Sequence, residues 1–447
     1  MGTLESVAER VGLAIAQPLF IIHMKIAYAT TYDVRDRASW PRRHLGLYGA
    51  GQKIADLLQH AGAELEFLGP LERRKVPITR LKWLIYQRLG QSYYSPVEPW
   101  VAPYYARQLE ARLARSQADL LLCPENAMPL ARVRTALPTV LWTDALLGSL
   151  VDFYPYLTDL CPETRRRLHV VEKEALERCD RVILTSQWAA QSAMELYGLP
   201  ADKIRIIPRG ASRAQDLTQT EIEALIAQRP PSPCRLLFLG VDWERKGGPL
   251  ALEVARILNQ QGVKTELWVV GCEPKWVGDR PSFVQSFGFI DRATPQGETQ
   301  FAHLLSTAHF LIFPTKADTF GVAISEANAA GLPCVAAAVG GIPTVLQSDI
   351  NGRAFSVEAT ASDYAQYIAA VMADYPRYQT LALSAWQHYR QHLSWEAAQQ
   401  QAWGYLQELV TDGDSSRPDP KADRSTTFNQ LLRPRSLFPA FGKGFRV

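Results

Sequence analysis

The chain has 447 residues, with 48 lysines and arginines against 45 aspartates and glutamates, for a net charge of +3. This near balance argues against a nucleic-acid-binding protein that depends on global positive charge. With 47% hydrophobic and 21% charged residues, the composition is that of a globular chain and excludes a disordered or fibrous one. A chain of this length predicts two or three domains.

The first 23 residues are expected to be an extension before the folded chain, which we expect to begin at Met24. The longest apolar run in this extension, 11–22, is too short to span a bilayer. Acidic residues precede that run where a signal peptide carries basic ones. Together with six scattered cysteines that show no C-x-x-C spacing, this favours a cytoplasmic protein without a disulfide framework.

From Lys25 onward, short apolar segments alternate with longer helical ones, which is the pattern of a parallel sheet covered on both faces. The first half predicts strands over 25–29, 64–68, 119–123, 139–142, 181–185 and 204–207. The helices predicted between them cover 50–61, 100–116, 165–178 and 187–197. We therefore predict an α/β, doubly wound domain over 24–212.

The polar stretch 213–233 ends in Pro230-Pro231-Ser232-Pro233, which favours an extended linker. A second alternating series follows over 234–393. Its predicted strands are 235–239, 265–270, 310–313 and 334–337, and its predicted helices lie near 249–261, 298–306, 322–330 and 361–373. Two such domains leave a cleft at the carboxyl ends of their strands, where open α/β sheets bind ligands. The composition of 412–447 predicts a disordered tail.

The first segment with chemical content runs from a strand through a loop beginning at Gly240 into a helix near Pro249. It presents Arg245 and Lys246 beside the N-terminus of that helix. Cationic side chains at a helix N-terminus suit a diphosphate. An exposed basic pair beside a tight turn fits this segment equally well.

The second segment is a strand followed by a loop through Gly321 and a short helix that ends at Gly331. Asp318 precedes this helix and Glu326 lies about one turn inside it. Two acceptors at different depths suit a ligand with hydroxyls at both ends, and free N–H groups at 320–322 suit phosphates between them. The alternative is that Asp318 caps the helix and Glu326 is solvated.

These two segments, with Cys334-Val335-Ala336-Ala337-Ala338-Val339-Gly340-Gly341-Ile342-Pro343, resemble the retaining family-4 glycosyltransferases of the GT-B fold. The resemblance covers 24–410 and includes 181–186 and 206–211. It implies two Rossmann-like domains facing a central cleft, with a nucleotide-diphosphate sugar bound mainly by the second domain. It also implies that a helix over 394–410 crosses back to complete the first domain.

By this resemblance, Arg245 and Lys246 would bind the diphosphate, Asp318 the hydroxyls of the transferred hexose and Glu326 the ribose. Further donor contacts would come from Gly240, Thr319, Phe320, Gly321 and Val322. The cations would stabilise the charge that develops on the leaving diphosphate, so no metal and no cofactor is expected. Family members usually carry glutamate at the first acidic position, and Asp318 is one methylene shorter.

The acceptor is expected to enter against the first domain. The loop 30–49 carries the candidates Trp40, His44 and Gly49, and Asp144 follows the strand 139–142. A surface loop and a turn cap are the alternative interpretations of these two regions.

The segment 73–89 is basic and amphipathic. Peripheral contact with the inner membrane face, and hence a lipid-linked acceptor, fits this pattern, and so does a solvated helix that covers its domain.

The expected function is transfer of a hexose from a UDP- or GDP-sugar to a saccharide, a polysaccharide precursor or a lipid-linked acceptor, as in polysaccharide or glycolipid biosynthesis. The alternative is a non-catalytic sugar-nucleotide-binding subunit with the same fold. A nicotinamide-dependent dehydrogenase is disfavoured. The dinucleotide-binding motif G-x-G-x-x-G, if it began at Gly49-Ala50-Gly51, would require its third glycine at position 54, where this chain has Ile54.

Overall fold

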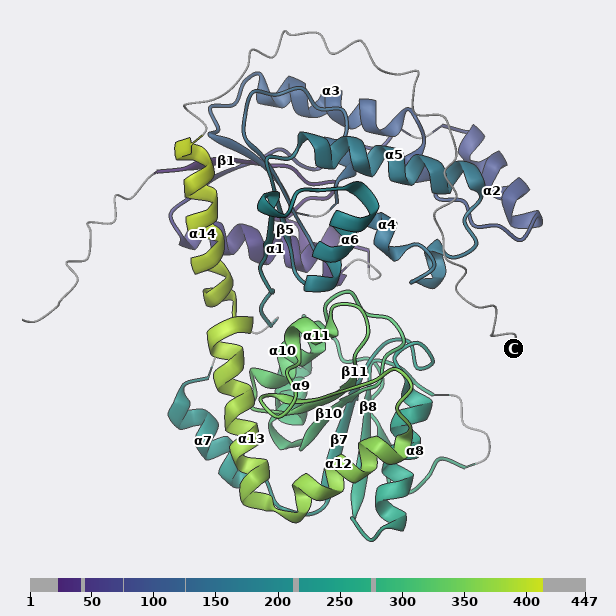
Figure 1. The fold of residues 1–447 in the computed structure, drawn as a ribbon, viewed down its shortest axis with the longest axis vertical. Coiled ribbons are helices and arrows are strands. Elements are labelled where there is room, and N and C mark those ends of the chain that lie inside the picture. Colours follow the sequence, from purple (N-terminus) through teal and green to yellow (C-terminus); the bar gives the residue numbers. More distant parts are fainter. Residues whose placement is uncertain are drawn as a thin grey trace, which may run out of the picture.

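The computed structural model describes residues 23–41, 45–74, 76–124, 126–211, 217–274 and 279–412. The extension up to residue 22, His44 and the tail from residue 413 lie outside the described residues. The described chain forms two lobes, each built on a six-stranded parallel sheet (Figure 1). The predicted pair of doubly wound α/β sheets is confirmed.

The first sheet has the strand order β2-β1-β3-β4-β5-β6. Its strands are β1 (Lys25–Tyr28), β2 (Glu64–Phe67), β3 (Leu120–Cys123), β4 (Thr139–Thr143), β5 (Arg181–Leu184) and β6 (Ile204–Ile206). The helices of this lobe are α1 (Leu45–His60), α2 (Ile78–Arg88), α3 (Val101–Leu113), α4 (Leu147–Leu150), α5 (Pro162–Arg178) and α6 (Gln187–Tyr197). Separate apolar cores lie on the two faces of the sheet, which explains why the central strand β3 is apolar at every position.

The second sheet has the order β12-β11-β10-β7-β8-β9. Its strands are β7 (Cys234–Leu239), β8 (Thr265–Val270), β9 (Val284–Ser286), β10 (Phe310–Phe313), β11 (Cys334–Ala337) and β12 (Gly352–Phe355). Its helices are α7 (Gln219–Gln228), α8 (Gly248–Gln260), α9 (Pro295–Thr307), α10 (Val322–Asn328), α11 (Ile342–Val345), α12 (Ala361–Ala373) and α13 (Tyr375–His388). The two edge strands, β9 and β12, are short and were not predicted.

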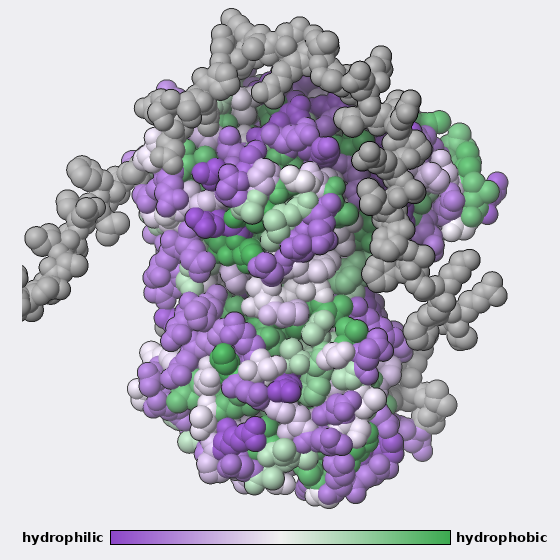
Figure 2. All heavy atoms as spheres, viewed as in Figure 1, coloured by the Kyte–Doolittle hydropathy of each residue, from purple (hydrophilic) through white to green (hydrophobic). Residues whose placement is uncertain are grey.

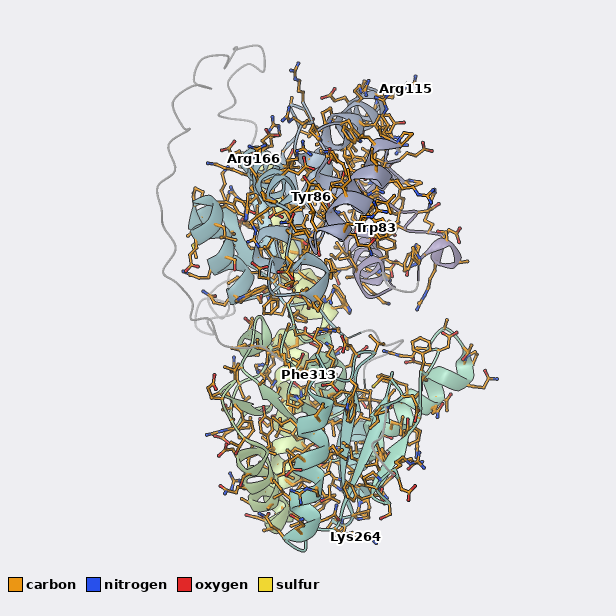
Figure 3. The ribbon with its side chains drawn as sticks, turned by 90° about the vertical axis from the view of Figure 1, so that its right-hand side faces the viewer. Trp83, Tyr86, Arg115, Arg166, Lys264 and Phe313 are labelled. Carbon is orange, nitrogen blue, oxygen red and sulfur yellow. The ribbon has the colours of Figure 1, made fainter. Side chains whose placement is uncertain are left out.

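The carboxyl ends of the second sheet face the first lobe. In Figure 3, Phe313 at the end of β10 lies close to the first lobe, whereas Lys264, just before β8, lies at the far end of the second lobe. Loops that follow β7, β10 and β11 are therefore directed toward the junction between the lobes. Figure 2 shows hydrophilic side chains over much of the visible surface, with an apolar protrusion at the position of α2.

The chain crosses back to the first lobe at its end. Helix α13 packs on the second lobe, and α14 (Trp395–Asp412) continues along the first one (Figure 1). Ala398, Ala402 and Leu406 of α14 are buried in the same apolar core as β1, and the indole N–H of Trp395 donates to the carbonyl of Ala211 at 3.0 Å. A single continuous segment thus ties the two lobes together.

The segment 213–233 is not an extended linker throughout, because α7 occupies its middle. Thr218 and Glu221 form a capping box at the start of α7, and Ile222 and Ile226 bury its inner face in the second lobe. The prolines that follow α7 end the helix. They led to the prediction of an extended linker, although the Thr-x-x-Glu start signal of α7 is present in the sequence.

Two buried polar side chains hold the end of this segment. Arg229, which is 3% exposed, donates to the carbonyls of Ser306 at 2.9 Å and of Ala330 and Gly331 at 2.6 Å each. His309 accepts from the backbone N–H of Arg235 at 3.0 Å and its other ring nitrogen contacts the carbonyl of Pro230 at 2.8 Å. The neutral ring satisfies both partners, because one nitrogen accepts and the other donates.

His309 predicts a dependence of stability on pH. Burial lowers its pKa from 6.5 to about 4, with the charges of Arg229 and Arg235 acting in the same direction. As pH falls from 6.5 to 4, this histidine is protonated in the unfolded chain but stays neutral in the folded one. Its contribution therefore lowers the free energy of unfolding by about 1.4 kcal/mol per pH unit. His309→Gln removes this contribution and flattens the pH profile of urea unfolding over that range. His303→Gln, at an exposed histidine of α9, serves as the matched control. An unchanged slope in His309→Gln would contradict the assignment.

Candidate functional site

Three loops of the second lobe meet at the junction, and glycines allow them to touch through their backbones. Gly247, which precedes α8, has φ of 80°, and a Cβ there would lie 1.9 Å from the carbonyl oxygen of Pro314. A Cβ at Gly340 would lie 2.1 Å from the carbonyl oxygen of Asp318. Any other side chain at these two positions would separate the loops after β7, β10 and β11.

Lys246 and Asp318 form an ion pair between two of these loops. The Lys246 Nζ lies 2.5 Å from Asp318 Oδ2, and Asp318 Oδ1 accepts from the backbone N–H groups of Gly321 at 2.6 Å and Phe320 at 3.2 Å. Burial alone would raise the pKa of the Asp318 carboxyl, but the charge and hydrogen bonds of Lys246 and the two N–H groups lower it overall. Asp318 is therefore ionised and caps the loop before α10 while it binds Lys246.

Arg245 reaches the first lobe. Its guanidinium donates to the carbonyl of Ala317 at 2.7 Å and lies 5.3 Å from the ring centroid of Tyr154, which belongs to the first lobe. Arg245 and Lys246 thus extend from the same loop to two different partners, one within the second lobe and one across the junction.

Glu326 lies on the inward side of α10 and is 8% exposed. Its Oε1 atom is 2.5 Å from Arg292 Nη1, and Arg292 Nε lies 2.9 Å from Glu298 at the start of α9. Arg292 was missed by the sequence analysis, since it lies 34 residues from Glu326 in a segment without a distinctive pattern. The arginine holds one carboxylate oxygen of Glu326, so the alternative of a merely solvated Glu326 does not apply.

The first lobe contributes a second ion pair at the junction. Asp144 Oδ2 lies 2.9 Å from Arg209 Nη1, and the Arg209 guanidinium lies 5.6 Å from the ring centroid of Phe320. Burial raises the pKa of Asp144, Arg209 opposes this shift, and the charge of Asp318 adds to it. Asp144 and Asp318 therefore act on each other electrostatically from opposite lobes.

Direct hydrogen bonds also join the lobes. The Ser186 hydroxyl donates to the carbonyl of Thr319 at 3.3 Å, and the N–H of Gln187 donates to the Thr344 hydroxyl at 2.9 Å. The loop that includes Thr319 and the start of α6 are therefore in contact. Ser186 is also the N-cap of α6, where its hydroxyl accepts from Ala189.

The other acceptor candidates need correction. Trp40 is only 6% exposed, packs against Tyr32 and Tyr48 in the core of the first lobe, and donates its indole N–H to the carbonyl of Asp33 at 2.7 Å. It is a core residue because burying its large ring satisfies both the apolar surface and the single polar group. Gly49 lies inside α1, which begins at Leu45, and His44 lies outside the described residues.

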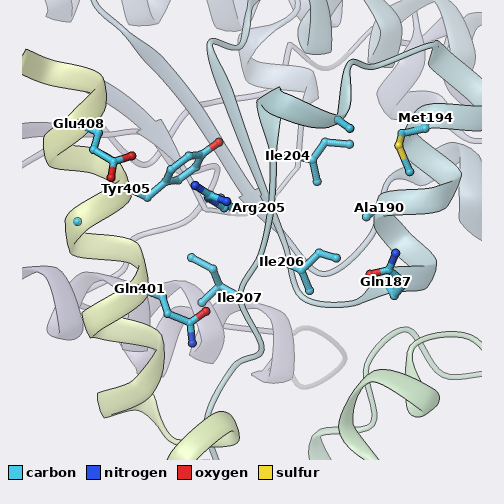
Figure 4. Close-up of a pocket in the computed structure, with 12 residues that line it drawn as sticks. Gln187, Ala190, Met194, Ile204, Arg205, Ile206, Ile207, Gln401, Tyr405 and Glu408 are labelled. Atoms are coloured by element: carbon cyan, nitrogen blue, oxygen red, sulfur yellow. The ribbon is translucent and has the colours of Figure 1, made fainter. Parts of the chain in front are cut away.

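The described residues carry no group of three or more His, Cys, Asp or Glu side chains that could hold a metal ion. A cavity of about 570 Å³ lies elsewhere, between β6, α6 and α14 (Figure 4). Its lining includes Ile204, Ile206 and Tyr405 and none of the predicted donor residues. No described helix is long and apolar enough to cross a bilayer.

Comparison with known proteins agrees with this architecture. The family described as Glycosyltransferase Family 4 matches residues 53–215, and the family described as Glycosyl transferases group 1 matches residues 233–374. Among solved structures, sucrose-phosphate synthase of Thermosynechococcus elongatus has a TM-score of 0.58 at 18% identity, over 87% of this chain and 100% of that one. WaaG, a glycosyltransferase involved in lipopolysaccharide biosynthesis, has a TM-score of 0.54 at 17% identity, over 84% of this chain and 98% of that one. The fold is therefore GT-B.

The two family matches cover one lobe each, and the chain belongs to the group 1, family 4 glycosyltransferases, as its motifs predicted. It is similar to the D-inositol 3-phosphate glycosyltransferase of Nocardia farcinica, at 27% identity over 48% of this chain and 50% of that protein. The corresponding protein of Xylanimonas cellulosilytica is 26% identical over 50% of this chain and 56% of its own length. The chain thus spans about half the length of the curated relatives it matches.

The Lys246–Asp318 pair predicts a measurable coupling energy. Both side chains are largely buried, so their charges attract strongly. Either charge left buried without its partner would destabilise the folded state. We expect a double-mutant cycle with Lys246→Met and Asp318→Asn to give a coupling of about 1–3 kcal/mol in urea unfolding. The asparagine keeps an oxygen for the two backbone N–H groups, so the cycle isolates the charge.

The exposed pair Arg353–Asp349 is the matched control, with an expected coupling below about 0.5 kcal/mol. Equal coupling energies for the two pairs would contradict the buried, ionised state of Asp318.

Proposed function

We propose that this protein is a retaining glycosyltransferase that moves a hexose from a UDP- or GDP-sugar to a saccharide, polysaccharide-precursor or lipid-linked acceptor without a metal. The observation that carries this proposal is the Lys246–Asp318 ion pair with Arg245 beside it at the lobe junction, next to the N-terminal end of α8. Glu326 is buried in α10, the helix that follows the loop of Asp318. A diphosphate sugar offers two phosphates for the cations and hydroxyls at both ends for the carboxylates.

The cations supply the main catalytic effect. Breaking the bond between the sugar and the diphosphate leaves negative charge on phosphate and positive character on the sugar. Arg245 and Lys246, fixed before the reaction by contacts to Ala317 and Asp318, are held ready to stabilise that charge. Such preorganised donors in other enzymes contribute about 10²–10³-fold each to kcat.

The carboxylates orient the donor. Asp318 Oδ1 already accepts from two backbone N–H groups, whereas Oδ2, which binds Lys246, has a second lone pair that can accept a sugar hydroxyl. In Glu326, Arg292 engages Oε1, which leaves Oε2 to accept from the ribose. Further contacts are proposed from Gly240 and the backbone of 319–322, with the N–H groups of Phe320 and Gly321 first released from Asp318.

The acceptor is proposed to lie on the side of the first lobe, next to Asp144 and Arg209. The names of related proteins support the proposed classes of donor and acceptor. Anabaena Alr3699/HepE, solved in complex with UDP and glucose, has a TM-score of 0.53 at 18% identity over 86% of this chain and 100% of its own. The curated relatives act on D-inositol 3-phosphate by name, so a phosphorylated polyol belongs in the acceptor screen.

Donor binding is the first test. We expect UDP- or GDP-sugars to raise the Tm of the full chain, because a ligand that binds only the folded state stabilises it. Lys246→Ala and Glu326→Ala should abolish this shift. Lys264→Ala, at the far end of the second lobe, should keep it. A screen in which no nucleotide sugar changes the Tm would contradict the proposal.

Transfer is the second step of the same test. Incubation of the donor that binds with an acceptor panel, followed by anomeric analysis of the product by NMR, should give a product with the configuration of the donor. Donor binding without transfer to any acceptor would favour the non-catalytic sugar-nucleotide-binding subunit instead.

A further inference from the structure

Helix α2 turns Thr79, Lys82 and Tyr86 toward the protein, and its apolar residues lie on the exposed part of its surface together with Arg80 and Arg88. Its partly buried positions are Thr79, Lys82 and Tyr86, which follow one another at helical spacing. No residue of the helix is buried. The usual arrangement of a surface helix is the reverse, with the apolar stripe against the core.

The inner side of α2 is held by charge. Lys82 Nζ lies 2.9 Å from Glu98 Oε1 and 3.1 Å from Glu163 Oε1, and Glu98 is 1% exposed. Tyr86 stacks on Tyr93 with ring centroids 5.8 Å apart. These contacts fix the rotation of the helix about its axis, so its apolar residues cannot turn inward without breaking a buried ion pair.

The outer side of α2 carries a compact apolar surface, which we call the α2 face. It consists of Ile78, Leu81, Leu84, Ile85 and Leu89, which share one side of the helix, and of Trp83, which flanks them; their exposed fractions run from 41% to 65%. This face is the apolar protrusion of Figure 2, and Figure 3 views it with Trp83 labelled. Contiguous exposed apolar surface of this kind marks a binding surface, and a convex one does not form a groove for a peptide.

Basic side chains surround the α2 face. The segment 73–90 contains no acidic residue, and Arg73, Arg74, Arg80 and Arg88 are all exposed and form no ion pair among the residues described. A helix with an apolar side, basic flanks and an exposed tryptophan matches the requirements of an anionic bilayer surface.

We propose that the α2 face binds the surface of a bilayer that contains anionic lipids. The apolar residues enter the headgroup and upper acyl region, and the flanking arginines bind lipid phosphates. The helix has 11 residues and lies in the plane of the interface. This inference is independent of the proposed catalytic function.

Backbone hydrogen bonds connect the segment after α2 to the segment of the first lobe that reaches the lobe junction. After α2, the N–H of Ser92 donates to the carbonyl of Asp159 at 2.8 Å, and the N–H of Cys161 donates back to Ser92 at 2.9 Å. The segment that ends at Asp159 includes Tyr154, which contacts Arg245 at the junction. A bilayer bound to α2 therefore lies on the lobe where the acceptor is expected.

Vesicle co-sedimentation of the full chain tests the proposal. We expect binding to vesicles of phosphatidylcholine with about 30 mol% phosphatidylglycerol and much weaker binding to pure phosphatidylcholine. The double variant Leu81→Glu/Ile85→Glu should lower the partition coefficient at least tenfold, since it removes apolar surface and adds repulsion. Arg80→Gln or Arg88→Gln should each lower it about fivefold.

The controls are matched in chemistry and placed elsewhere. Leu196→Glu changes an exposed leucine of α6, and Lys264→Gln removes an exposed cation at the far end of the second lobe. Both should bind vesicles like the unmodified chain. The substituted side chains of α2 are exposed, so a Tm of the double variant equal to that of the unmodified chain reports an intact fold.

Three results would overturn the proposal. Equal binding of the double variant and the unmodified chain would locate attachment outside α2, and absence of vesicle binding would exclude it altogether. A dimer seen by light scattering that Leu81→Glu/Ile85→Glu dissociates would show that a second copy covers the α2 face. None of these results affects the donor-binding test, so the two proposals fail separately.

Discussion

The ion pair between Lys246 and Asp318 is the interaction on which the candidate site depends. The two residues are 72 positions apart in sequence and belong to loops that leave neighbouring strands of one sheet. Asp318 also binds two backbone N–H groups before α10, so one carboxylate fixes both the lysine and the entry to the next helix. Without the Asp318 charge, the loops after β7 and β10 would lose the ion pair that joins them.

Backbone packing makes that pair possible. Gly247 and Gly340 stand where any Cβ would collide with a neighbouring carbonyl, which brings the three loops into direct contact. Behind them, Arg229 binds the carbonyls at the ends of α9 and α10, so the helix that carries Glu326 is held at its far end as well. The positions of Asp318, in the loop before α10, and of Glu326, inside α10, therefore depend on these contacts as well as on the helix, which has only seven residues.

The sequence was sufficient to predict the approximate positions of those candidate residues that lie close to glycines in short motifs. Arg245, Lys246, Asp318 and Glu326 flank turns whose strand and helix neighbours have clear periodicity, so their approximate positions follow from the order of a parallel sheet. Arg292, Arg209 and Tyr154 were missed because their roles arise only from tertiary contacts between distant segments. Trp40 was misjudged for the same reason, since a tryptophan in a loop rich in basic residues gives no local sign that it enters the core.

Helix α2 shows a related limit of sequence patterns. An amphipathic repeat indicates that a helix has two unlike sides, but it does not indicate which side faces the protein. In α2 the ion pair with Glu98 determines which side of the helix faces the protein. The Glu98 carboxylate is 1% exposed and pairs with Lys82 and Arg167. Turning α2 over would take Lys82 away from this carboxylate and leave Arg167 as its remaining cation, which destabilises the buried charge. The same orientation leaves the leucine and isoleucine side chains of α2 on the surface, where the proposed bilayer contact would cover them.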